Sequence, residues 1–70
     1  MAIQYGDLVE VTTADEQRVR MRALGAPTKG RDFPIVWVCT EEEWERFQSS
    51  GEEPDGTPWP VQYVAELMNA

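Results

Sequence analysis

The stretch that decides the fold is FPIVWVC, residues 33–39, because it is apolar on both of its alternating faces. Successive side chains of a strand point to opposite sides of the sheet, so a strand with two apolar faces has to be covered on both sides. We therefore expect a central strand here, with Trp37 as the least exposed of the three tryptophans. Cys39, the only cysteine, should be a small buried hydrophobe at the end of this strand.

A short helix is predicted directly after this strand, near residues 41–49. Thr40 and Glu43 have the spacing of a capping box, in which the hydroxyl and the carboxylate each satisfy a free backbone N–H. Trp44 and Phe47, three positions apart, give the helix one apolar face. Two serines and a glycine then end it.

Two further strands are predicted in the first third of the chain. Residues 6–11, GDLVEV, read as a turn followed by a strand, and residues 18–22, RVRMR, alternate strictly between polar and apolar. Val19 and Met21 should therefore face inward, toward the valines of the first strand. The alternate positions form an outward-facing arginine stripe, which consists of Arg18, Arg20 and Arg22.

Three segments connect or follow these elements. Glycine and proline break the pattern in residues 24–30, LGAPTKG, which we expect to be a mobile surface loop. Residues 52–58, EEPDGTP, carry two prolines and a glycine in a charged run, so we expect an exposed loop with neither helix nor strand. The pattern of residues 60–68 fits a helix as well as a strand and leaves the choice open.

Length and charge limit the function. We expect residues 1–70 to form one small domain. The net charge is −7, and residues 36–70 carry all of the excess. Such a charge repels nucleic-acid phosphates and anionic membranes, so a basic or neutral protein or peptide is the expected partner. No signal peptide and no long apolar run is present, which predicts a cytoplasmic protein. The oligomeric state stays open.

The residue inventory argues against an enzyme. The chain has no histidine, and its only serines, Ser49 and Ser50, lie where the predicted helix stops, so no nucleophile can pair with a histidine base. One cysteine without histidine excludes an internal disulfide and the usual zinc clusters. The carboxylates lie at a helix N-terminus or in a polar loop without calcium-loop spacing. We expect no catalytic residue, no metal site and no cofactor.

The aromatic residues supply the remaining functional signal. Trp59 lies between two prolines, in a stiff segment that could either cover the core or present the indole to a partner. If the chain is a recognition module, the predicted protein-binding surface consists of Trp59, Pro60, Tyr63, Glu52, Glu53 and Asp55. The alternative is a nucleic-acid-directed protein. In that case either the arginine stripe binds a phosphate backbone, or the acidic half imitates DNA and blocks a DNA-binding protein.

The segment GTPWPVQYVAEL, residues 56–67, resembles the closing part of Src homology 3-like (SH3-like) barrels. That family closes its barrel with a short 3₁₀ turn and a final strand, and Pro60, Tyr63 and Val64 match its proline and Tyr-Val positions. The resemblance implies a small barrel and peptide binding by Pro60 and Tyr63. Together with the predicted helix, which replaces the hairpin that precedes the closing turn in that family, it predicts an α+β, mainly β, barrel of four to five short strands with one inserted helix near residues 41–49. Residues 30–39 together with Trp59 and Pro60 also look like short uncharacterised proteins of actinobacteria and their phages, which lend no function.

The charge balance generates a prediction about DNA. We expect no detectable binding to a labelled duplex at physiological salt, measured by fluorescence anisotropy, because the net charge of −7 opposes phosphate. Micromolar binding that weakens steeply as salt is added would instead favour the arginine stripe as a DNA contact.

Overall fold

The computed structural model describes residues 3–67 and contains mainly β structure with one helix in that range. The predicted mainly β class with an inserted helix is confirmed, with six strands in the described residues rather than four or five. In chain order the elements are β1 (Leu8–Thr12), β2 (Arg18–Ala23), β3 (Thr28–Lys29), β4 (Pro34–Thr40), α1 (Glu41–Ser50), β5 (Thr57–Pro60), the 3₁₀ turn η1 (Val61–Tyr63) and β6 (Val64–Glu66).

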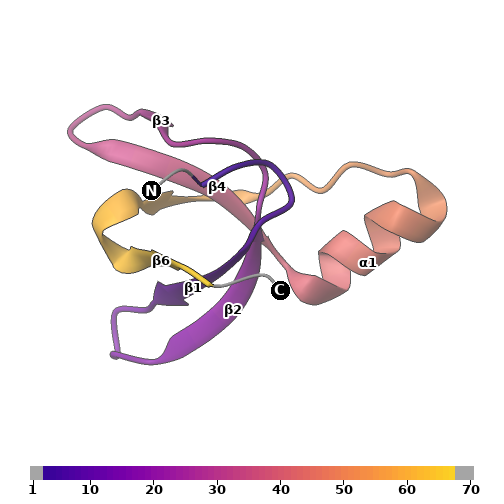
Figure 1. The fold of residues 1–70 in the computed structure, drawn as a ribbon, viewed down its shortest axis with the longest axis horizontal. Coiled ribbons are helices and arrows are strands. Elements are labelled where there is room, and N and C mark those ends of the chain that lie inside the picture. The colour runs from indigo at the N-terminus through magenta and orange to yellow at the C-terminus, as the bar shows by residue number, and fades with distance from the viewer. Residues whose placement is uncertain (1–2, 68–70) are drawn as a thin grey trace.

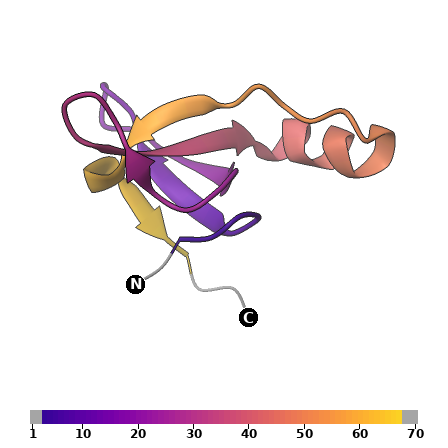
Figure 2. The same ribbon diagram turned by 90° about the horizontal axis from the view of Figure 1, so that it is seen from above.

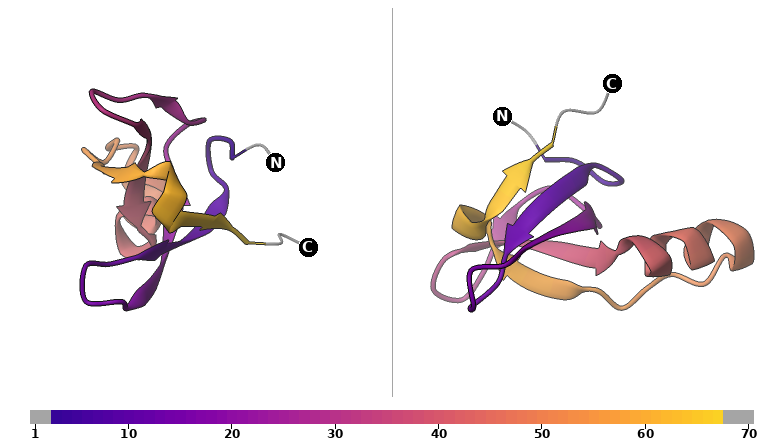
Figure 3. Two further views of the ribbon diagram at one scale, coloured as in Figure 1. Left: turned by 90° about the vertical axis from the view of Figure 1, so that its left-hand side faces the viewer. Right: turned by 90° about the horizontal axis from the view of Figure 1, so that it is seen from below.

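The strands form one antiparallel sheet, in which pairing runs in the order β3-β4-β2-β1-β6. The remaining strand, β5, lies off this path and also pairs with β4. The sheet curls into a small half-barrel, with η1 connecting β5 to β6 (Figure 1, Figure 3). β4 therefore occupies the predicted central position, because it pairs with β2, β3 and β5.

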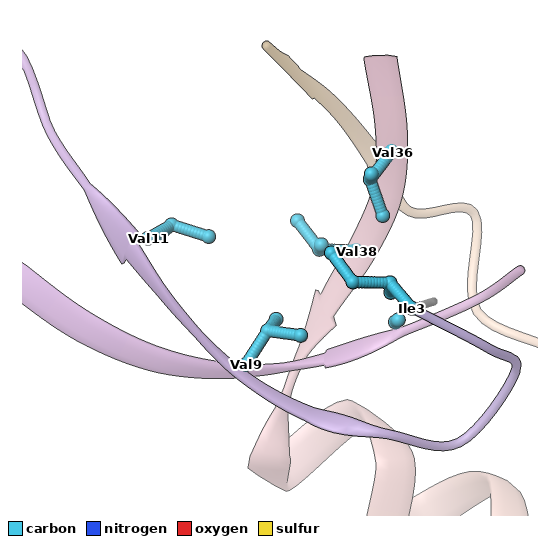
Figure 4. Close-up of a cluster of buried hydrophobic side chains, with 6 residues drawn as sticks. Ile3, Val9, Val11, Val36 and Val38 are labelled. Carbon is cyan, nitrogen blue, oxygen red and sulfur yellow. The ribbon is translucent and has the colours of Figure 1, made fainter. Parts of the chain in front are cut away.

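Small branched side chains fill the inside of the half-barrel. Val9 and Val11 of β1 meet Val36 and Val38 of β4, and all four are fully buried (Figure 4). Ile3 completes the cluster from the N-terminal segment, and Met21, Trp59, Val61 and Val64 pack against it partly buried. Aromatic rings thus lie at the margin of the core and not at its centre.

Two predicted core positions are wrong. Trp37 is 42% exposed and is more exposed than either of the other tryptophans, because the alternation of β4 points Val36 and Val38 inward and Trp37 to the outer face. Val19 points inward but is 39% exposed, because β4 pairs with β2 only at residues 21–23 and leaves the first half of β2 uncovered. Cys39 is buried as predicted.

Short strands replace parts of the predicted loops. The segment 24–30 contains β3, in which Thr28 lies opposite Ile35, and the segment 52–58 ends inside β5. Proline has no backbone N–H, so it is tolerated in an edge strand where that side of the residue faces away from the ladder. The strand β5 is such an edge strand, because it is paired only with β4. Of the ambiguous residues 60–68, Pro60 ends β5, and residues 61–66 form η1 followed by β6, as the SH3-like resemblance implied. Residue 68 lies outside the described residues.

The helix α1 has both predicted caps. The Thr40 hydroxyl accepts a hydrogen bond from the Glu43 backbone N–H, and the Thr40 backbone N–H donates to the Glu43 carboxylate, each at 3.1 Å. Gly51 ends the helix in the left-handed conformation with φ 78°.

Trp44 packs the first part of α1 against the N-terminal segment. Its ring makes edge contacts with Tyr5 and Phe47 at centroid distances of 5.4 and 5.8 Å. The rest of α1 projects away from the half-barrel, and the chain returns beside it (Figure 2). We call residues 41–56 the arm. No helix in the described range is long and apolar enough to cross a membrane.

Replacing Thr40 by alanine should lower the free energy of unfolding by about 1 kcal/mol, because both hydrogen bonds of the capping box are lost or weakened. Urea denaturation followed by circular dichroism measures the change. Thr40→Ser keeps the hydroxyl and should retain most of the stability, and Gln48→Ala, on the exposed face of the same helix, should stay within about 0.5 kcal/mol. A Thr40→Ala protein as stable as the wild type would contradict the capping role.

Candidate functional site

A hollow of about 520 Å³ lies between the β1–β2 turn and the junction of β5 with η1. We call it the groove. The turn contributes polar and small side chains, and the junction contributes aromatic and proline side chains. The lining residues are Thr12, Thr13, Ala14, Glu16, Trp59, Pro60 and Tyr63.

Trp59 is held in place from two sides. Its indole Nε1 donates a hydrogen bond to the backbone oxygen of Thr12 at 3.2 Å, across 47 residues of sequence. On β5 it lies opposite Val36 and packs against the core, half-buried. Trp59 therefore covers the core and also lines the groove. The two alternatives left open by the sequence, a cover for the core and a contact for a partner, are compatible.

Tyr63 supplies the exposed aromatic ring of the groove. η1 presents it with 49% of its surface exposed. Tyr63 and Thr12 also line a second hollow of about 270 Å³, which includes Glu10 and Arg18. The two hollows meet at these shared residues, so the Tyr63 ring is accessible from both.

The opposite wall of the groove is an ordered turn. The Thr13 backbone N–H donates to the oxygen of Gln17 at 2.8 Å, and the Glu16 N–H donates to the oxygen of Thr13 at 3.0 Å. The Thr13 hydroxyl also bonds to the Asp15 carboxylate. Glu16 adopts a positive φ of 64°, a conformation that a non-glycine residue keeps only where its surroundings hold it. The backbone of Glu16 therefore has a defined place beside the groove, which its side chain lines.

The six residues of the predicted protein-binding surface do not lie together. Trp59, Pro60 and Tyr63 converge on the groove, as expected. Glu52, Glu53 and Asp55 instead line a separate hollow of about 300 Å³ in the arm, together with Glu43, Arg46 and Pro54. The arm and η1 lie at opposite ends of the long axis of the molecule, which measures 34 Å (Figure 1). The expected acidic border of the groove is thus wrong for these three residues.

The contribution of the β1–β2 turn to the groove was not predicted from the sequence. Glu16 and residues 12–14 reach Trp59 only through the curling of the sheet, and the polar run 12–17 carried no signal beyond that of a connection. Glu16 is the acidic residue that lines the groove.

The arginine stripe is not a uniform basic surface. Arg20 lies opposite Glu10 in the β1–β2 register, and Arg18 lines the second hollow beside Tyr63. Arg22 is half-buried, and its Nη1 donates to the backbone oxygen of Gly6 at 3.0 Å. One member of the stripe therefore has a structural role, and another lies next to an acid.

Cys39 lies opposite Arg22 on the outer face. Burial raises the pKa of the Cys39 thiol, the nearby Glu43 carboxylate raises it further, and Arg22 opposes the rise. A thiol with a raised pKa is a weaker nucleophile near neutral pH. Among residues 3–67, no three acidic or thiol side chains are grouped so that they could hold a metal ion.

No family model matches the chain, and no curated protein or solved structure is significantly similar to it.

The placement of Trp59 generates a prediction about stability. Trp59→Ala should lower the free energy of unfolding by about 2–4 kcal/mol, because it removes packing against the core and the hydrogen bond to Thr12. Urea denaturation measures the loss. Tyr63→Ala is the matched control at the same groove and should cost less than about 1 kcal/mol, since Tyr63 is exposed. Equal losses in the two variants would contradict the two roles.

Proposed function

We propose that this chain is a non-catalytic interaction module of the cytoplasm, in one domain, and that it binds an extended peptide segment of a protein partner in the groove beside Tyr63. The observation that carries the proposal is the convergence of Trp59, Pro60 and Tyr63 on one hollow that faces an ordered turn. Aromatic side chains in a well-formed hollow are the usual anchors of protein recognition.

The groove is preorganised, which favours binding. The hydrogen bond from Trp59 to Thr12 and the packing of Trp59 on the core fix one wall, and the bonded turn around Thr13 fixes the other. Binding to such a surface orders few additional side chains, so less of the interaction free energy is spent on lost entropy.

The architecture also supports peptide binding in the groove. A curled antiparallel half-barrel that closes through a 3₁₀ turn and a last strand is compatible with an SH3-like fold. We assign the chain to that class of barrel, with α1 inserted between β4 and β5. The resemblance implies peptide contacts from Pro60 and Tyr63, and both residues line the groove.

Charge indicates which peptides would fit. Glu16 borders the groove, Glu10 and Arg18 both line the second hollow, and the whole chain carries −7. Glu16 and the net charge repel an acidic segment and favour a neutral or basic one. A peptide long enough to pass Tyr63 would contact both hollows.

The test selects peptides from a random library displayed on phage and then measures their dissociation constants. Tyr63→Ala should weaken the selected peptides about tenfold or more while leaving the melting temperature nearly unchanged. Tyr5→Ala is the matched control, because Tyr5 is also exposed, at 54%, but packs against Trp44 and does not line the groove. Its affinity should equal that of the wild type.

Two results would overturn the proposal. One is a set of selected peptides that bind Tyr63→Ala as tightly as the wild type. The other is the failure of the library to yield any peptide that the folded wild type retains.

A further inference from the structure

An apolar patch lies on the outer face of the sheet, at the end of β5 that is remote from the groove. Trp37 is 42% exposed there and lies opposite Pro58 in the β4–β5 register. The Leu24 backbone N–H donates to the oxygen of Trp37 at 2.7 Å, which keeps Leu24 beside it. We call Leu24, Trp37 and Pro58 the outer patch. The groove involves the other end of β5, at Trp59 and Pro60.

Gly56 joins the outer patch to the arm. It has a positive φ of 78°, and a Cβ at this position would lie 2.7 Å from Leu24 Cδ1 and 3.6 Å from Trp37 Cε3. The positive φ favours glycine, and a side chain at this position would have to displace Leu24. Asp55, the residue before Gly56, is exposed and lines the acidic hollow of the arm together with Glu53. The backbone therefore leads from the outer patch at Gly56 directly into that hollow.

The arm that adjoins the patch is predominantly negative. Residues 41–55 hold seven acidic residues and one basic residue, Arg46, so their net charge is −6. The helix α1 buries none of its residues fully, and Glu52, Glu53 and Asp55 are exposed. An exposed indole beside a strongly negative surface attracts a cation twice, once through the face of the ring and once through the carboxylates.

We propose that the outer patch and the acidic hollow of the arm form a second binding surface, and that it takes a basic, arginine-bearing segment of a partner protein. One guanidinium stacks on Trp37, because arginine stacks on aromatic faces, and a neighbouring arginine pairs with Glu53 and Asp55. An apolar side chain of the same segment covers Leu24 and Pro58. A second copy of this chain is disfavoured as the occupant, because it would bring a second arm of net charge −6.

The experiment titrates the ¹⁵N-labelled full chain with a short peptide of alternating arginine and leucine at low ionic strength. A peptide with glutamine in place of arginine is the matched probe. The arginine peptide should shift the Trp37 indole N–H and the amides of Glu53, Asp55 and Gly56, and the glutamine peptide should not. Added salt should weaken the binding, because exposed charges are screened.

Variants separate the ring from the charge. Trp37→Leu keeps an apolar side chain on the strand and should weaken the arginine peptide about fivefold, since only the π face is lost. The double variant Glu53→Gln/Asp55→Asn should weaken it about fivefold as well. Asp32→Asn/Glu66→Gln removes the same number of charges from exposed positions outside the patch and the arm, and should leave the affinity nearly unchanged.

Several results would overturn the proposal. These are the absence of binding, equal losses in the two double variants, and shifts that map to Tyr63 instead of Trp37. Concentration-dependent dimerisation that Trp37→Leu abolishes would assign the patch to a second copy. Shifts at Tyr63 would assign the arginine peptide to the groove, and the other results leave the groove untouched, because its test rests on Tyr63→Ala.

Discussion

The alternation of β4 is the constraint on which the rest of the structure depends. This strand pairs on both edges, so its two faces define the inside and the outside of the half-barrel. Val36 and Val38 point inward and meet the valines of β1, while Ile35 and Trp37 point outward. The register between β4 and β5 gives β5 the same two faces. Trp59 lies opposite Val36 on the inside, and Pro58 lies opposite Trp37 on the outside.

A core of valines has a consequence for the large aromatic side chains. The space inside so small a half-barrel is filled by β-branched residues, so the aromatic rings lie around its margin. Trp44 anchors α1 against Tyr5, Trp59 seals one end of the core, and Tyr63 projects beside it. Such rings stabilise the fold with one part of their surface and leave another part for recognition, which is how one short chain offers both a groove and an outer patch.

The charge of the chain is divided in space as well as in sequence. The arm carries its acids away from the half-barrel. Glu16 is therefore the one acidic residue among those that line the groove, whereas the outer patch adjoins the acids that follow α1. The proposed peptide groove and the proposed basic-segment surface therefore differ in charge and in position. Two surfaces at opposite ends of β5 would allow one partner to be held at two points or two partners to be held together.

The features that depend on near neighbours can be predicted from the sequence. The capping box of Thr40 and Glu43, the helix end at Gly51 and the alternation of β1 are local in origin, and the structure confirms them. The 3₁₀ turn before Val64 followed only from the resemblance to SH3-like barrels. Long-range contacts set which face of β4 is covered, how much of Val19 stays exposed, and how the six candidate binding residues divide between the groove and the arm. These features depend on contacts such as that of Trp59 with Thr12, 47 residues apart, and on the direction in which α1 leaves the sheet. Hydrophobic periodicity gives the two faces of a strand but not the element that packs on each, because that choice is made by pairing register and by long-range packing.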